Sequence, residues 1–225
     1  MRFFLFLFSC PLLFPLLAAS ETLRYSVNWP TGLPLGEASF TADNLDANSA
    51  AERKFEFHLE ASIPTFSVVD DLSARVSPDY CAIALTKRIQ HGKRKGEETL
   101  SFDRAASTME RKTRNGGSSR VAIENCAKDA LGFVYFLRQE LRQGRIPPPG
   151  KVYFGAAYQI AIAHQGTTKL NVKGTPSDVD RFQVTIVGPA SRNQIELYIA
   201  RDTAHTPVLF RVPLILGAFT MEIVE

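Results

Sequence analysis

The segment Cys126–Gly144, CAKDALGFVYFLRQELRQG, is the long stretch of this chain whose apolar residues recur at a helical period. Leucine and valine repeat every three or four residues, and two phenylalanines widen the stripe: Leu131, Phe133, Val134, Phe136, Leu137 and Leu141. The opposite face is left with Lys128, Gly132, Tyr135, Gln139 and Arg142. We therefore predict a helix over 127–143 whose apolar stripe packs against the concave face of a sheet, mainly through Phe133, Val134, Leu137 and Leu141.

Residues that cap or stop helices mark both ends of this segment. Asn125 can cap the first amide groups, and Asp129 suits the positive end of the helix dipole. Gly144, followed by prolines at 147–149, ends the helix. A single apolar helix in a chain of strands suggests a plug or a lid.

The first 20 residues have the organisation of a secretory signal peptide. Arg2 is followed by a Phe- and Leu-rich core over 3–17 and by small residues at 18–20. A membrane anchor is the rival interpretation, but Pro11 and Pro15 interrupt the core, which falls short of the roughly 20 residues that span a bilayer. A lipoprotein signal at Cys10 is disfavoured because the apolar core continues past it. We expect cleavage near Ala19 or Ser20, export, and no transmembrane segment afterwards.

The mature chain, 21–225, is about 205 residues long, which suits one domain. Alternating apolar and polar residues, separated by Gly, Pro and Asn turns, predict strands through most of it. We therefore expect a mainly β fold, a strongly curled antiparallel sheet or barrel of about a dozen short strands with one buried amphipathic helix. The expected strands cover 23–29, 35–42, 55–60, 66–76, 82–89, 99–103, 107–113, 152–153, 158–164, 169–172, 182–187, 195–200, 208–212 and 218–224, and a loop covers 115–119.

Charge is nearly balanced along the chain. The formal net charge is +3, and it falls by one when the leader takes Arg2 away. This balance does not indicate a nucleic-acid binder. A local basic cluster suits the solvated end of a hairpin, and the alternative is contact with an anionic lipid, a glycolipid or an acidic partner. The cluster contains Lys87, Arg88, Lys93, Arg94 and Lys95.

Two cysteines, Cys81 and Cys126, remain once the leader and its Cys10 are removed. In an oxidising compartment they form the natural disulfide pair, which would tie a strand to the start of the helix. The alternative is a reactive thiol at Cys126, because the amino end of a helix favours a thiolate.

Two motifs carry a resemblance to a known family. Tyr25, Val27, Trp29, Gly32 and Gly36 form Y-x-V-x-W-x-x-G-x-x-x-G, and the helix adds D-x-L-x-x-x-Y-x-L-R from Asp129 to Arg138. With Gly144, Asp202 and Pro207, the chain resembles the exported bacterial family catalogued as domain of unknown function 3108 over most of its mature length. The resemblance implies an exported envelope protein in the periplasm of a Gram-negative bacterium and brings no established activity. The chain departs from the pattern at His205, where the family more often carries Arg and an ion pair at that turn.

Signals for catalysis, cofactors or metals do not stand out. His58, His91, His164 and His205 lack metal-ligand spacing, and the chain has no G-x-S-x-G motif. Asp70 and Asp71 are a pair that could hold a hard cation, but further acidic ligands at useful spacing are missing. We expect a non-enzymatic protein without cofactor or metal.

Two functional classes remain, with a hydrolase as the least favoured third. The first is a scaffold or interaction domain for an unidentified envelope protein, with the helix filling the interior. The second is a carrier or binder of an apolar or amphipathic molecule such as a lipid or a lipoprotein. Bulky aromatics usually fill a β core, which favours the scaffold. The residues expected in the core or facing a ligand are Trp29, Phe133, Tyr135, Phe136 and Leu137.

Overall fold

The computed structural model describes residues 20–43, 45, 50–63, 66–214 and 217–224. Apart from Ser20, the predicted signal peptide lies outside these ranges. The described residues form one helix and a single sheet of 15 strands. The elements are β1 (Glu21–Asn28), β2 (Pro34–Asp43), β3 (Arg53–Ile63), β4 (Phe66–Val76), β5 (Ala82–His91), β6 (Arg94–Asp103), β7 (Thr108–Thr113), β8 (Ser118–Ala122), β9 (Lys128–Asp129), α1 (Ala130–Arg142), β10 (Gly150–Tyr153), β11 (Ala157–Val172), β12 (Thr175–Val187), β13 (Arg192–Ala200), β14 (Pro207–Leu214) and β15 (Gly217–Ile223).

The sheet is an antiparallel meander that the chain enters in the middle. Its order runs from β8 down to β1, then from β15 down to β9, so the first and last strands pair and both chain halves extend outward from them. The β9–β10 pair is parallel. The mainly β prediction is confirmed, but several strands are longer than expected, and β8 replaces part of the predicted loop at 115–119. The segments 158–164 and 169–172 join into β11, with an irregularity between His164 and Thr167.

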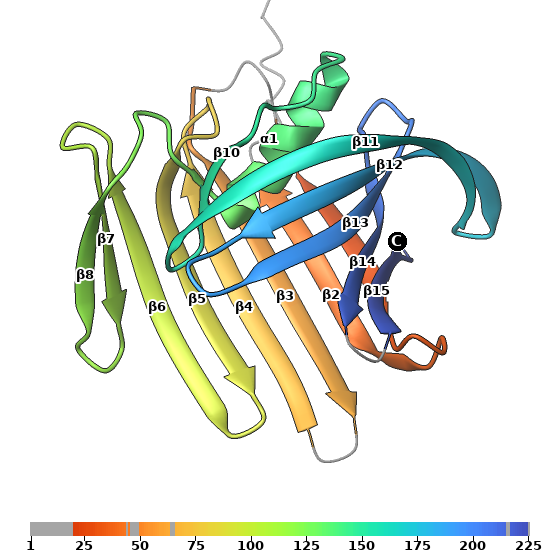
Figure 1. The fold of residues 1–225 in the computed structure, drawn as a ribbon, viewed down its shortest axis with the longest axis horizontal. Coiled ribbons are helices and arrows are strands. Elements are labelled where there is room, and N and C mark those ends of the chain that lie inside the picture. Colours follow the sequence, from red (N-terminus) through yellow and green to blue (C-terminus); the bar gives the residue numbers. More distant parts are fainter. Residues whose placement is uncertain (1–19, 44, 46–49, 64–65, 215–216, 225) are drawn as a thin grey trace, which may run out of the picture.

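The sheet curls around α1 without closing into a full barrel (Figure 1). The helix lies inside the curl, against β3 and β4 on one side and β9 and β10 on the other. The curl brings the β9 end of the sheet back to the start of β5, where the Ala82 amide donates to the Ala127 carbonyl at 2.8 Å. At the same seam Cys81 and Cys126 form the predicted disulfide, with Cα atoms 4.8 Å apart. The disulfide therefore joins parts of the sheet that are far apart in strand order.

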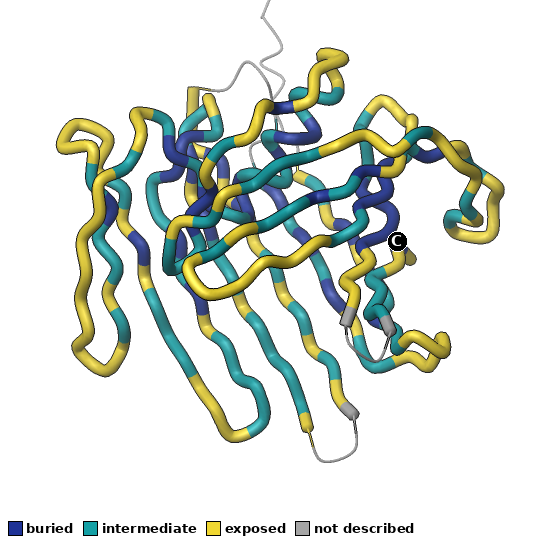
Figure 2. Tube along the Cα trace, in the orientation of Figure 1, coloured by how far each residue is buried: buried dark blue, intermediate teal, exposed yellow. Residues whose placement is uncertain are grey.

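Burial is concentrated around the helix. The buried residues gather on the strand segments that surround α1, and the free ends of β3–β6 are more exposed (Figure 2). Tyr25 of β1 is fully buried, makes edge-to-face contacts with Phe40 and Phe210, and donates its hydroxyl to the Pro207 carbonyl at 2.8 Å. This one side chain links β1, β2 and β14. These contacts give a structural reason for the tyrosine of the amino-terminal motif.

The helix starts three residues later than predicted, and its cap is a different residue. The Asp129 carboxylate accepts the Leu131 and Gly132 amides at 2.9 and 2.8 Å, which makes Asp129 the N-cap. Asn125 instead accepts a hydrogen bond from Arg104 Nε, so the prediction that it caps the helix is wrong. At 13 residues α1 is too short to cross a bilayer, and the described ranges hold no other helix that could.

Candidate functional site

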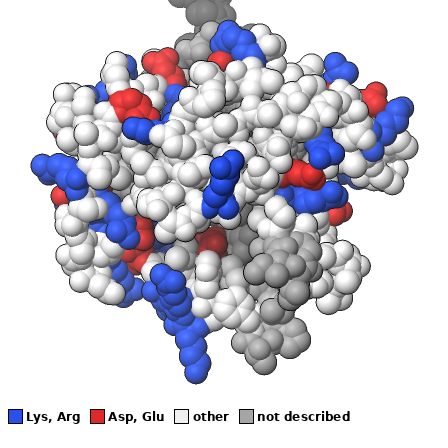
Figure 3. Space-filling model, in the orientation of Figure 1, with Lys and Arg blue, Asp and Glu red and all other residues white. Residues whose placement is uncertain are grey.

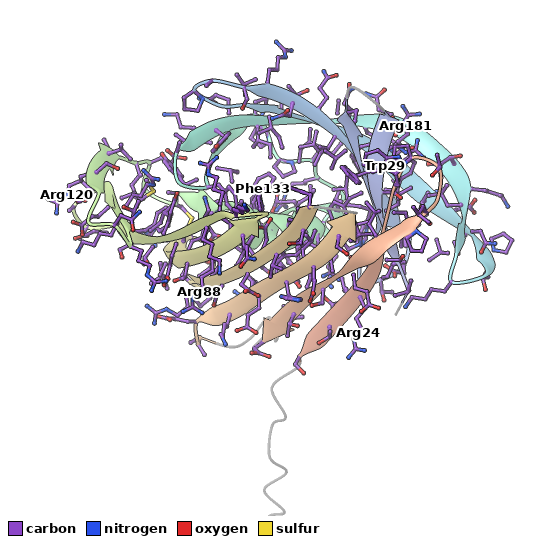
Figure 4. All side chains as sticks on the ribbon, turned by 90° about the horizontal axis from the view of Figure 1, so that it is seen from below. Arg24, Trp29, Arg88, Arg120, Phe133 and Arg181 are labelled. Carbon is purple, nitrogen blue, oxygen red and sulfur yellow. A yellow bond between two sulfur atoms is a disulfide. The ribbon has the colours of Figure 1, made fainter. Side chains whose placement is uncertain are left out.

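A cavity of about 280 Å³ lies between α1 and the carboxy-terminal half of the sheet. Its wall comes from the helix and from β10–β14, and almost all of it is apolar. The helix contributes Ala130, Phe133, Val134, Leu137 and Arg138, and the strands contribute mainly Ile160, Ile162, Val184, Ile186, Ile195, Leu197, Ile199 and Phe210. Figure 4 shows Phe133 in the space between the two halves of the sheet.

The expected packing of the helix stripe is therefore partly wrong. Phe133 and Val134 are half-buried and face the cavity, and Leu137 is buried at its edge. The helix aromatics do not fill the interior, because Phe133 leaves the space between itself and β11–β13 open. The sequence could not show this gap, since it depends on the distance between the helix and the far wall.

The other face of the helix is the tightly packed one, although the sequence pattern places Gly132 and Tyr135 opposite the apolar stripe. The Tyr135 ring stacks on Phe55 of β3 with centroids 4.1 Å apart. A Cβ atom on Gly132 would lie 2.8 Å from a Val76 methyl group. Glycine thus lets the helix approach β4, and α1 packs on β3 and β4 through this face.

Arg138 anchors the helix to two distant parts of the chain. Its terminal nitrogens donate to both carboxylate oxygens of Glu21 at 2.5 and 2.8 Å, and Nε donates to the carbonyls of Ala204 and His205, each at 3.2 Å. Burial disfavours the charge, but the hydrogen bonds and the charge of Glu21 outweigh it and raise the pKa of Arg138. Every nitrogen of this guanidinium is engaged. The arginine of the D-x-L-x-x-x-Y-x-L-R motif therefore has a structural role, because it ties α1 to β1 and to the turn before β14. His205 contributes its backbone carbonyl to this clamp.

Asp129 is a buried acid at the start of the helix. It is fully shielded from solvent, and Oδ2 has no hydrogen-bond partner among the described residues. Burial raises its pKa from the ordinary 3.8 to about 6, against the opposing effect of the two amides it accepts.

The basic cluster does not lie together on the surface. Arg88, Lys93, Arg94 and Lys95 are exposed, and Arg88 points outward (Figure 4). Lys87 alternates to the inner face, and its side chain is only 9% exposed. The prediction that Lys87 belongs to an anionic-surface contact is therefore wrong. Charged side chains of both signs are scattered over the face seen in Figure 3, separated by uncharged surface.

Inside the sheet, Lys87 of β5 belongs to a small polar cluster with Glu98 of β6 and Arg111 of β7. Arg111 holds Glu98 with two bonds of 3.0 and 2.7 Å. Lys87 Nζ lies 3.5 Å from Glu98 and 4.0 Å from the ring centroid of Phe154, a residue of the cavity wall. We did not predict this cluster. The signal was present, since Leu85, Lys87 and Ile89 alternate onto one face of their strand.

Two predicted aromatic site residues lie away from the cavity wall. Phe136 packs beside Tyr80 and under the Lys128 ammonium, which is 4.2 Å from its ring centroid. Trp29 contacts Phe219 edge to face at 4.9 Å. Neither lines the cavity.

Three histidines pair with aspartates on the strands. Asp71 on the outer face lies 2.7 Å from His58, and Asp70 on the inner face lies 2.8 Å from His91. Because adjacent residues of β4 point to opposite faces, Asp70 and Asp71 cannot share a cation. His164 lies 3.3 Å from Asp180. Within the described ranges, groups of three or more His, Cys, Asp or Glu able to hold a metal are absent.

A larger depression of about 610 Å³ is lined by residues of β4–β7. Its charges compensate one another, since Glu97 lies 3.5 Å from Arg88 and 3.7 Å from Arg114. The apolar cavity is the better candidate site because its wall offers a ligand a chemically uniform surface.

In a comparison with protein families, the model described as "Protein of unknown function (DUF3108)" matches residues 24–224. The chain belongs to this family. The DUF3108 match spans both motifs and all strands from β2 to β15. No curated protein sequence matches the chain.

Two solved structures were compared with the chain, both at low sequence identity. A beta-barrel-like protein of the domain of unknown function DUF1849 from Brucella abortus is 7% identical, with a TM-score of 0.59, over 93% of this chain and 97% of that one. A candidate lipoprotein from Parabacteroides distasonis is 10% identical, with a TM-score of 0.36, over 96% and 99% of the two chains. The first likeness supports the curled barrel-like architecture and says nothing about activity.

Proposed function

We propose that this protein binds one apolar or amphipathic chain in the cavity beside α1, as a non-enzymatic carrier or binder. The observation that carries the proposal is the apolar wall, to which Arg138 alone contributes a charge, already neutralised by Glu21. A wall of this kind recognises a ligand by shape and by burial of hydrocarbon. The proposal ranks the carrier above the scaffold that the sequence favours.

The size of the cavity supports this proposal. An apolar cavity of about 150 Å³ holds one benzene molecule, so 280 Å³ has room for roughly 11 carbon atoms. This corresponds to one medium-length alkyl chain. It is too small for a two-chain lipid to enter completely.

The exposed apolar wall points the same way. Hydrocarbon that covers the wall removes apolar surface from water, which is worth roughly 25 cal/mol per Å². Larger apolar residues at Ala130 or Val134 would fill the same space without a ligand.

We also infer that the protein works in the cell envelope after export. The leader at 1–20 and the Cys81–Cys126 disulfide both suit an oxidising compartment. Hydrophobic chains need shielding from water in such a compartment, and the interior of the sheet supplies it.

The test is a chain-length series of neutral alcohols from hexanol to tetradecanol, titrated calorimetrically into the mature protein. Each methylene buried adds about 0.8 kcal/mol, so affinity should rise about fourfold per carbon and level off near roughly 11 carbons. The Ala130→Leu variant adds three carbons to the cavity wall and should move the plateau about three carbons lower.

The matched control is Ala106→Leu, the same substitution at an exposed turn position, which should leave the plateau unchanged. Absence of alcohol binding, or a plateau that Ala130→Leu does not move, would contradict the proposed cavity.

A further inference from the structure

The cavity has a buried cation beside it that the fold does not fully engage. Lys87 projects from β5 into the sheet, with its side chain 9% exposed. Its ammonium lies on the ring of Phe154, 4.0 Å from the centroid, and Phe154 forms part of the cavity wall. The ammonium is thus one aromatic side chain away from the apolar space.

The contacts of Lys87 are long. Nζ donates to Glu98 Oε2 at 3.5 Å and to the Phe154 carbonyl at 3.4 Å. An ammonium has three donors and normally makes charged hydrogen bonds of about 2.7 to 2.9 Å. Lys87 is therefore only loosely satisfied.

Glu98 cannot serve Lys87 better, because Arg111 already holds both of its oxygens at 3.0 and 2.7 Å. The hydrogen bonds from Arg111 keep the pKa of Glu98 below its ordinary value. Asp70, another acid on this inner face, is bonded to His91 at 2.8 Å. Burial lowers the pKa of Lys87 despite the opposing charges of Glu98 and Asp70.

Arg138, the other cation at the cavity, differs from Lys87 because its hydrogen bonds are already made. Arg138 lines the cavity wall directly, yet Glu21 and two backbone carbonyls occupy all of its nitrogens. A ligand anion gains little at Arg138. At Lys87 the same anion replaces two long contacts with one short bond in a poorly solvated place.

We propose that Lys87 binds the anionic head group of a single-chain amphiphile whose alkyl chain fills the cavity, a carboxylate of the fatty-acid class. This inference rests on the proposed function and adds the head group to it. Phe154 then lies between chain and head, with its ring against the first carbons. Glu98, itself held by Arg111, stays within 3.5 Å of Lys87 on the neighbouring strand.

The experiment compares decanoate with decanol, which have the same chain length and differ in the charge of the head. Both are titrated calorimetrically at pH 7.5 into the wild-type protein, Lys87→Gln, and Lys93→Gln, a control at the exposed turn after β5. Wild type and Lys93→Gln should bind decanoate at least about tenfold more tightly than decanol, the usual effect of a charged hydrogen bond. Lys87→Gln should bind decanoate about tenfold more weakly than wild type does. Its affinity for decanol should stay within twofold of the wild-type value.

The other outcomes separate failure of the head-group assignment from failure of the cavity proposal. Equal affinity of wild type for decanol and decanoate overturns the head-group assignment and leaves the cavity proposal standing. No binding of either compound overturns both. Acetate, the head group without the chain, should not compete with decanoate at equal concentration, and competition would overturn a site built for an amphiphile.

A second measurement applies even when Lys87→Gln does not fold. Reductive methylation of the wild-type lysines, followed by mass spectrometry, should show Lys87 protected at least about fivefold more by decanoate than by decanol, with Lys93 unaffected by either. Equal protection of Lys87 by the two compounds would overturn the proposal.

Discussion

Asp129, the buried N-cap carboxylate, makes the free energy of unfolding depend on pH, and the structure determines the direction of that dependence. The pKa of Asp129 rises from 3.8 to about 6 on folding because the group is buried. The native state therefore binds the proton more tightly than the unfolded chain. The stability that Asp129 contributes is fully present below pH 3.8 and is lost as the pH rises through 6. This shift corresponds to about 3 kcal/mol in total, of which about 2 to 3 kcal/mol falls between pH 4 and 7.5.

The perturbation is Asp129→Asn, because an asparagine oxygen can still accept the Leu131 and Gly132 amides but does not titrate. Urea unfolding of wild type and variant at several pH values gives the difference in free energy of unfolding. That difference should shift in favour of the variant by about 2 to 3 kcal/mol from pH 4 to 7.5. The comparison cancels all other titrating groups and any constant offset from the amide.

Asp129→Ala removes both the charge and the N-cap hydrogen bonds, so its comparison with Asp129→Asn separates the two effects. It should show the same dependence on pH, displaced by about 1 kcal/mol for the lost cap. A difference that stays flat with pH, or that moves in favour of aspartate at pH 7.5, would refute the reasoning and show that the helix dipole stabilises the charged form more than burial destabilises it.

Two further substitutions test the framework that holds the cavity. Arg138→Met should cost about 3 to 5 kcal/mol in urea unfolding, because it leaves the Glu21 carboxylate and two carbonyls without their donor; a cost below about 1 kcal/mol would contradict the clamp. The double variant Cys81→Ala, Cys126→Ala should lose roughly 4 kcal/mol, since the bond closes a loop of 45 residues. Wild type unfolded under dithiothreitol should match the double variant, and an unchanged midpoint would argue against a role for the disulfide in holding the seam.

Several features of the fold follow from local sequence patterns. Alternation in segments such as Phe55, Phe57 and Leu59 predicts strands with one buried face, and the structure has β3 there with that alternation. The helical period from Leu131 predicts α1. The disulfide follows from the cysteine count once the predicted leader is set aside, and the structure confirms the pair. These are short-range or compositional signals, so they can be read without coordinates.

The orientation of α1 needed the tertiary structure. A helical stripe identifies which residues share a face but not which face meets the closest neighbour. Phe55 and Val76 pack tightly against the helix, and the residues that meet them are Tyr135 and Gly132, an aromatic with a polar tip and a residue without a side chain. Hydrophobicity alone ranks both below Phe133.

The cavity and the buried Lys87 also required the structure, for a different physical reason. The cavity is the space left when α1 packs on β3 and β4 while the second half of the sheet curls over it at a larger separation. Lys87 becomes buried because β10 and the turn after it pass above β5, a contact between residues 67 positions apart. The sequence determined the helix, most of the strands, the mainly antiparallel pairing and the covalent link between Cys81 and Cys126. The curvature of the sheet sets the distances between elements that are far apart in the chain. Those distances create the empty volume and bury the cation beside it, so only the tertiary structure could show them.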